Sequence, residues 1–146
     1  MVALAVAVGD ASTVLLVQEA RLDCRGTYYV PAGRSKQGED PLQTAVRVTQ
    51  QKTGLIVEAD GVLGVEHSLP VGQFPGQLRV VVRVRVIGGQ LRTKPDDHAL
   101  DAMWVRLGDI PRLRLRSDDF LPWVQDESEG LLQALPVASW RAVGKR

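Results

Sequence analysis

One segment of the sequence, residues 40–53, constrains the fold more than any other because it carries the start, the buried face and the stop of a helix. Asp40 is a favoured N-cap residue, Pro41 suits the first turn, and Gly54 suits the position after the last turn. At about 100° per residue, the face that we expect to be buried carries Leu42, Ala45, Val46, Thr49 and Thr53. The rest of the helix, which we expect to face a cleft or solvent, carries Arg47, Val48, Gln51 and Lys52.

Short runs rich in β-branched residues surround this helix and predict strands. The ranges are 2–8, 13–19, 28–30, 55–57, 62–66, 78–87 and 102–107. A second helix is predicted over 118–125, capped by Ser117, with a further helical turn at 131–135. A chain of 146 residues that is 45% hydrophobic can bury a core, so we expect one α/β domain over residues 1–146.

The most regular strand pattern lies at residues 78–87. One side of this strand is apolar and carries Leu78, Val80, Val82, Val84 and Val86. The other side is rich in arginine and carries Arg79, Arg83 and Arg85. These arginines either bind phosphate groups or form a solvated strand face or a partner surface, and the sequence leaves the alternatives open.

The overall charge and the chain's start exclude several classes of partner. Lys and Arg number 18 against 17 Asp and Glu, and this net charge of +1 gives no general attraction to nucleic acid or anionic membranes but leaves a local basic patch open. The apolar stretch from Met1 to Val8 lacks a basic leader and is too short to cross a bilayer. The single cysteine, Cys24, cannot pair within the chain, so nothing indicates an oxidising compartment. By default, with no targeting evidence, we expect a cytoplasmic protein.

Residues 33–55 also carry a spaced motif. Gly33 is followed after five residues by Glu39, after seven more by Arg47, and then by Gly54-Leu55. This spacing resembles the Nudix box, G-x5-E-x7-R-E-U-x-E-E-x-G-U, in which U is a bulky aliphatic residue. The resemblance implies a Nudix-type α/β/α sandwich with a mixed central sheet. Residues 25–33 and 88–93 also look like the Nudix branch that hydrolyses oxidised guanine nucleoside diphosphates.

The sequence departs from the box at the residues that carry its chemistry. In the family, three glutamates on one helix face hold Mg²⁺ or Mn²⁺ ions, which stabilise the phosphates and activate water. Here these positions are Val48, Gln51 and Lys52, and the aliphatic position is Thr49. Valine offers no ligand, glutamine offers one neutral oxygen, and lysine brings a positive charge. We therefore predict no metal site and no cofactor at this face.

The retained box residues have structural interpretations beside the functional ones. The resemblance implies that Glu39 and Arg47 pair to brace the loop against the helix. Gly33 either needs a positive φ or aims its carbonyl at a metal, and structure alone explains it. Glu66, at a strand end, is a candidate general base or base-recognition group, or an ordinary surface carboxylate. Tyr28 and Tyr29 are candidates for stacking on a base, although one of two adjacent strand residues normally points into the core.

Two functions remain from the sequence. The first is a catalytically impaired Nudix domain that binds a nucleoside di- or triphosphate through Lys52 with Arg79, Arg83 or Arg85, or that binds a protein partner. The alternative is a working Mg²⁺-dependent nucleoside diphosphate hydrolase whose metal is held by Glu39, Glu66 and the Asp96-Asp97 loop, next to which His98 is a candidate ligand for a softer metal only. The resemblance also makes a homodimer an expectation.

Overall fold

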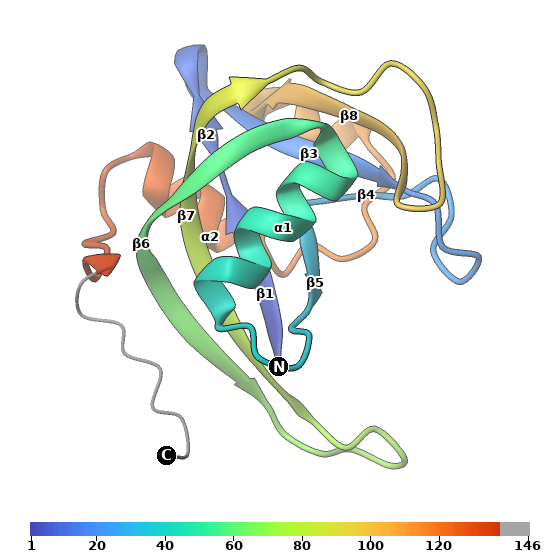
Figure 1. Cartoon of the computed structure of the whole chain (residues 1–146), viewed down its shortest axis with the longest axis vertical. Helices are drawn as coiled ribbons and strands as arrows, with labels where there is room; N and C mark the ends of the chain where they lie inside the picture. The colour runs from blue at the N-terminus through green and yellow to red at the C-terminus, as the bar shows by residue number, and fades with distance from the viewer. Residues whose placement is uncertain (138–146) are drawn as a thin grey trace.

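The computed structural model describes residues 1–137, which form two sheets and two α-helices (Figure 1). The first sheet is mixed, because β1 and β7 are parallel and the other pairs are antiparallel. Its strand order is β5 (Ala32–Arg34), β1 (Val2–Val6), β7 (Gln77–Gly89) and β6 (Leu55–Ser68). The second sheet is antiparallel and contains β2 (Val8–Gly9), β3 (Thr13–Glu19), β4 (Tyr28–Tyr29) and β8 (Ala99–Arg106).

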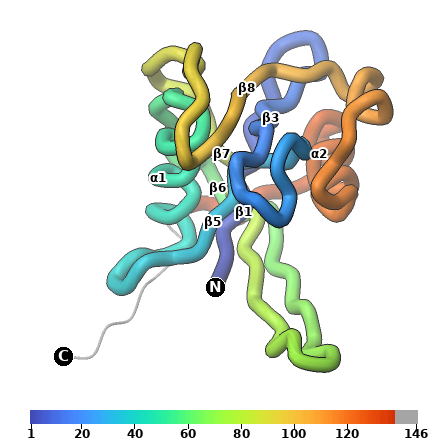
Figure 2. Tube along the Cα trace, turned by 90° about the vertical axis from the view of Figure 1, so that its right-hand side faces the viewer, coloured from blue at the N-terminus to red at the C-terminus, as the bar shows by residue number. Residues whose placement is uncertain are grey.

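The two α-helices lie on opposite sides of the mixed sheet (Figure 2). Helix α1 (Pro41–Thr53) packs on the face of β7 that carries Val80, Val82 and Val84. Helix α2 (Leu121–Ser128) belongs to the second core cluster, which contains Val81 of the same strand. Short 3₁₀ helices η1 (Asp10–Ser12) and η2 (Leu107–Arg112) complete the elements. This layering confirms the predicted α/β/α sandwich with a mixed central sheet.

Helix α1 begins and ends where the sequence predicts. The Asp40 side chain accepts a hydrogen bond from the Gln43 backbone, and the Gln43 side chain accepts one from the Asp40 backbone, which forms a capping box. Gly54 ends the helix with φ of 81°, in the left-handed region that favours glycine. Val46 is only half-buried, whereas Val48, expected to face a cleft or solvent, is 3% exposed.

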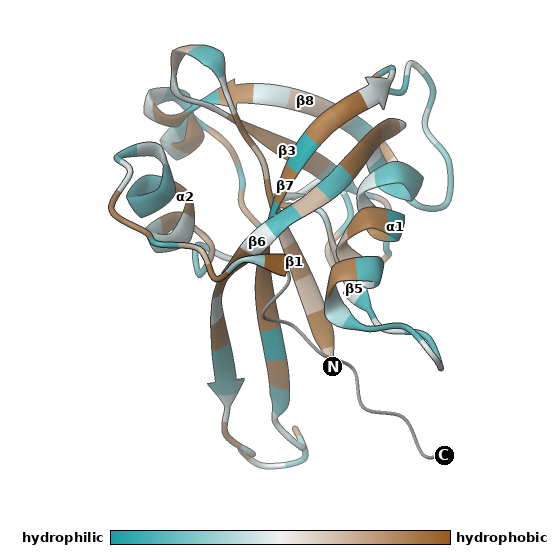
Figure 3. Cartoon of the chain, turned by 60° about the vertical axis from the view of Figure 1, so that its left-hand side comes forward, coloured by the Kyte–Doolittle hydropathy of each residue, from teal (hydrophilic) through white to brown (hydrophobic). Residues whose placement is uncertain are grey.

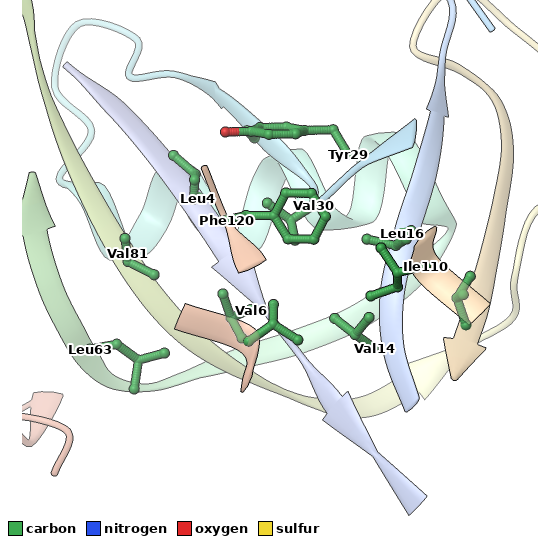
Figure 4. Close-up of a cluster of buried hydrophobic side chains, with 13 residues drawn as sticks. Leu4, Val6, Val14, Leu16, Tyr29, Val30, Leu63, Val81, Ile110 and Phe120 are labelled. Atoms are coloured by element: carbon green, nitrogen blue, oxygen red, sulfur yellow. The ribbon is translucent and has the colours of Figure 1, made fainter. Parts of the chain in front are cut away.

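The arginine side of β7 is buried at Arg79 and Val81 and exposed at Arg85, so of the alternatives left open the solvated face applies only to the far end of the strand. Val81 lies on the same face as the arginines and is fully buried among the side chains that Figure 4 shows, with Leu63 and Phe120. Arg79, two residues away, is only 9% exposed. A central strand between two helix layers buries apolar residues on both sides, so alternation along the strand did not reveal which side was solvated.

Several predicted boundaries are wrong. Residues 55–57 and 62–66 belong to one strand, β6, whose register shifts at three points along β7. Helix α2 begins at Leu121 rather than residue 118, and Ser117 does not cap it. Residues 131–135 are not helical, because Leu135 pairs with Val62 through two backbone hydrogen bonds of 2.9 Å each. Neither α-helix within residues 1–137 combines the length and hydrophobicity that a membrane crossing requires.

Strands β6 and β7 continue past the sheet as a two-stranded arm, residues 67–78, which projects from the body (Figure 3). The strand β1 pairs with β7 only from Arg79 onward, so the arm lies beyond that register. Its tip carries exposed apolar side chains, including Leu69, Val71 and Phe74.

Candidate functional site

A pocket of about 440 Å³ lies beside α1, and its charged lining is entirely cationic. The wall is built from β1, β4, β5, α1 and β7, together with Arg21 before β4, Phe74 between β6 and β7, and Arg116 between η2 and α2. Six basic side chains line it: Arg21, Arg34, Arg47, Lys52, Arg79 and Arg116. No lining residue is acidic. A pocket of this size and charge suits an anionic small molecule.

Five carboxylates approach these cations without lining the pocket. Asp23 pairs with Arg21, Glu39 with Arg47, Glu66 and Asp119 with Arg79, and Glu19 with both Lys52 and Arg116. The ion pairs among residues 1–137 do not include Arg34. Six cations against five carboxylates leave one positive charge uncompensated.

Glu39 and Arg47 form the bracing pair that the sequence predicts. Arg47 Nε lies 2.7 Å from Glu39 Oε2, and Arg47 Nη2 lies 2.8 Å from Oε1. Arg47 also donates to the Arg34 carbonyl at 2.9 Å and to Gln51 Oε1 at 3.0 Å. The hydrogen bonds from Arg47, and next that from the Lys36 backbone, lower the pKa of Glu39 to about 2. Glu39 therefore ties the loop to α1 and has both oxygens engaged.

Gly33 is required by close packing rather than by a positive φ. Its φ is not among the positive values, which corrects one of the two interpretations above. A Cβ atom at Gly33 would lie 2.5 Å from Val48 Cγ1, well inside van der Waals contact. Strand β5 can approach α1 only because position 33 has no side chain and position 48 carries a compact one.

Lys52 is paired with Glu19, a residue that sequence reasoning missed. Glu19 ends β3 and its side chain is 1% exposed. Its two carboxylate oxygens lie 3.7 Å from Lys52 Nζ and 3.7 Å from Arg116 Nη1, and neither accepts a hydrogen bond within residues 1–137. Burial lowers the pKa of Lys52, and the Glu19 carboxylate offsets part of that shift. The ammonium group is thus held at the pocket wall by an anion behind it.

Arg79 is held in a second network behind the pocket. Arg79 Nε donates to Glu66 Oε2 at 3.0 Å, and Nη1 donates to Asp119 Oδ2 at 2.9 Å. The Tyr29 hydroxyl donates to Asp119 Oδ1 at 2.6 Å, and the Trp123 indole donates to the other oxygen of Glu66. Burial alone would raise the pKa of Asp119, but the hydrogen bonds from Tyr29 and Arg79 outweigh it and lower that pKa. Glu66 is consequently engaged on both oxygens and does not line the pocket.

The structure separates the three strand arginines. Arg79 lines the cationic pocket, whereas Arg83 and Arg85 line a second hollow of about 550 Å³ beside Trp104. Arg83 pairs with Asp60 at 3.3 Å and with Glu127 at 3.1 Å, and Arg85 pairs with Glu58. The physical reason is the buried Val81 between them, which fills the shared face and leaves Arg79 and Arg83 at opposite edges of the core.

The loop of residues 96–98 does not reach the pocket lining. Asp96 accepts hydrogen bonds from Arg92 and from the backbone N–H groups of His98 and Ala99, and Arg92 above all holds its pKa well below the usual range. Asp97 and His98 are exposed. Across residues 1–137 no group of three or more His, Cys, Asp and Glu side chains is arranged to hold a metal ion.

The face of α1 that carries Val48, Gln51 and Lys52 does not fit a hard divalent cation. Val48 has no donor atom, Gln51 Oε1 already accepts a hydrogen bond from Arg47, and Lys52 carries a positive charge. Hard cations prefer several oxygen ligands, most of them charged, and repulsion from Lys52 opposes binding. This face instead presents hydrogen-bond donors to an anion.

A family model and curated relatives both match this chain. A family model described as NUDIX domain matches residues 1–124. Two curated relatives are the putative nudix hydrolase 1 of Caenorhabditis elegans, 37% identical over 120 residues, and the human 8-oxo-dGDP phosphatase NUDT18, 36% identical over 126 residues. These alignments cover 81% and 85% of this chain but 32% and 37% of the relatives, so the chain spans about a third of their length.

A solved structure supports the same fold. The NUDIX hydrolase from Nitrosomonas europaea superposes with a TM-score of 0.83 at 21% identity, covering 97% of this chain and 95% of that one. At this identity the likeness concerns the fold alone.

Proposed function

Because this chain belongs to the Nudix family, we propose that it is a Nudix domain that binds a nucleoside di- or triphosphate without a metal ion and hydrolyses it weakly or not at all. The observation that carries the proposal is the cationic pocket, whose box positions hold Val48, Gln51 and Lys52 in place of carboxylates. A Nudix enzyme normally offsets the charge of a diphosphate with metal ions. Here fixed side chains supply that charge.

The basic side chains of the pocket provide two kinds of donor. Lys52 offers a compact ammonium, and Arg116 offers a planar guanidinium that binds two phosphate oxygens side by side. Glu19 sets the position of both groups from behind, at 3.7 Å from each. The exposed Arg34 adds a cation that no carboxylate of residues 1–137 neutralises. Binding through such contacts weakens with salt, because exposed charges are screened within about 8 Å at physiological ionic strength.

Calorimetric titration with GDP and with inorganic pyrophosphate tests this proposal. We expect both to bind in EDTA at least as well as in Mg²⁺, because Mg²⁺ neutralises part of the phosphate charge, and to bind more weakly as salt rises. Lys52→Gln should weaken both about tenfold or more, because a charge-assisted hydrogen bond contributes about 1.5–3 kcal/mol. Lys36→Gln is the matched control, since Lys36 is an exposed lysine on the adjoining loop that does not line the pocket. Binding that disappears on chelation would refute the proposal.

The second candidate is Mg²⁺-dependent hydrolysis of a nucleoside diphosphate, which the name of the human relative favours. It requires carboxylates outside the box. Three of the four proposed from sequence are engaged elsewhere, Glu39 by Arg47, Glu66 by Arg79 and Asp96 by Arg92. The fourth, Asp97, is exposed and does not line the pocket. A screen of nucleoside di- and triphosphates with Mg²⁺ and Mn²⁺, read as released phosphate or, by chromatography, as released nucleotide, separates the two candidates. Metal-dependent turnover that a Glu66→Gln variant loses would favour the hydrolase.

A further inference from the structure

The cationic pocket continues into a smaller hollow at its outer end. This hollow, of about 250 Å³, is lined by residues from the N-terminus, β5 and the arm, and it shares Val2, Arg34, Phe74 and Gln77 with the cationic pocket. Lys52 and Arg116 belong to the cationic pocket alone. The combined groove therefore has a cationic part and a part walled by an aromatic ring and a guanidinium.

Phe74 presents its ring from a constrained turn. Its backbone N–H donates to the Val71 carbonyl at 2.9 Å, and the Val71 N–H donates to the Phe74 carbonyl at 3.0 Å. Gly72, inside this turn, has φ of 57°, which a glycine adopts without strain. The Phe74 side chain is nevertheless 46% exposed. A large apolar ring held open beside a charged pocket has unused surface for a planar ligand.

The other aromatic residue of the lining, Tyr29, is not available for stacking. It is 3% exposed, its ring packs edge-to-face with the Phe120 ring at a centroid distance of 5.4 Å, and the Arg116 guanidinium lies over it at 5.1 Å from the ring centroid. Figure 4 shows the Tyr29 ring within the core cluster. Of the two tyrosines predicted as stacking candidates, Tyr28 does not line the pocket. Phe74 is thus the lining aromatic with an open surface in residues 1–137.

We infer that Phe74 stacks on the base of the bound nucleotide, with the exposed Arg34 beside it, while Lys52 and Arg116 hold the phosphates. This inference rests on the proposed function and narrows its ligand class: the groove selects a phosphate ester that carries a planar heteroaromatic ring over a bare phosphate anion. Base–aromatic stacking is tolerant of base identity, because every base has a π-face. Arginine guanidinium planes stack on rings in the same way.

Two ligands and two variants test the inference by calorimetry. GDP presents both the base and the phosphates, whereas inorganic pyrophosphate presents only the phosphates. Phe74→Ala should weaken GDP binding about tenfold, equivalent to about 1.4 kcal/mol, and should leave pyrophosphate binding within about twofold. Phe74→Trp should retain GDP affinity. Val71→Ala is the matched control, because Val71 lies on the same turn, is 74% exposed and does not line the pocket.

The possible results distinguish a failure of this inference from a failure of the proposed function. If GDP and pyrophosphate both bind the wild-type protein but Phe74→Ala weakens neither, or weakens both equally, the stacking role is refuted and the anion site stands. If Val71→Ala weakens GDP binding as much as Phe74→Ala does, the weakening results from a destabilised arm, and the stacking role of Phe74 is likewise refuted. If neither ligand binds the wild-type protein, the inference and the proposed function fail together.

Discussion

Removing the charge of Lys52 while keeping its stem, as in Lys52→Met, should destabilise the fold. Glu19 has a side chain that is 1% exposed, and Lys52 Nζ and Arg116 Nη1 each lie 3.7 Å from one of its oxygens. At an effective dielectric of about 20, a pair at this distance interacts by about 4.5 kcal/mol. Because Arg116 remains and the buried ammonium no longer needs to be desolvated, we expect a net loss of about 3 kcal/mol.

Equilibrium unfolding in urea, followed by circular dichroism, measures this loss. A change of this size is a large share of the 5–15 kcal/mol typical of a folded domain, so the midpoint should fall clearly. Glu19→Gln/Lys52→Met removes both charges together and should lose clearly less than Lys52→Met alone, since no buried carboxylate is left short of a cation and the remaining Arg116 side chain is one third exposed. Lys36→Met, at an exposed loop lysine, should change stability by less than about 0.5 kcal/mol.

The double-mutant cycle decides whether the pair is real. If the losses from Glu19→Gln and Lys52→Met add in the double variant, the two side chains do not interact and the reasoning is refuted. A loss below about 0.5 kcal/mol for Lys52→Met alone would refute it as well, because Glu19 would then be stable without this cation.

Two further predictions concern the bracing of the box loop. Because the pKa of Glu39 falls from 4.5 to about 2 on folding, its contribution to stability is present above pH 4.5 and is lost as pH falls toward 2. Glu39→Gln should therefore flatten the plot of unfolding free energy against pH in this window. An unchanged plot would contradict the role of Arg47. Gly33→Ala should lower the unfolding free energy by about 1–3 kcal/mol, because the added Cβ would lie 2.5 Å from Val48 Cγ1. Adding Val48→Ala to this variant should restore most of the lost stability, as measured by thermal unfolding. If stability is not restored, the strain lies elsewhere.

The boundaries of α1 and the composition of its faces could be predicted from the sequence, since they depend on residues close together along the chain. The cap at Asp40, the stop at Gly54 and the pairing of Glu39 with Arg47 are all set within one helix and its entry loop. The same holds for the loss of carboxylates at Val48, Gln51 and Lys52, because residues three and four apart on a helix share a face. These features predicted the family fold and the absence of a carboxylate cluster on α1.

The composition of the pocket was decided by tertiary structure. Glu19 meets Lys52 because the end of β3 reaches the end of α1, a contact between residues 33 positions apart that no local periodicity reports. The strand pattern placed Arg79 and Arg83 on one side of β7 but did not show that the core cluster containing Val81 divides them. Strand alternation specifies only which side chains share a face. What covers that face, and which charge lies behind it, depends on how distant elements pack.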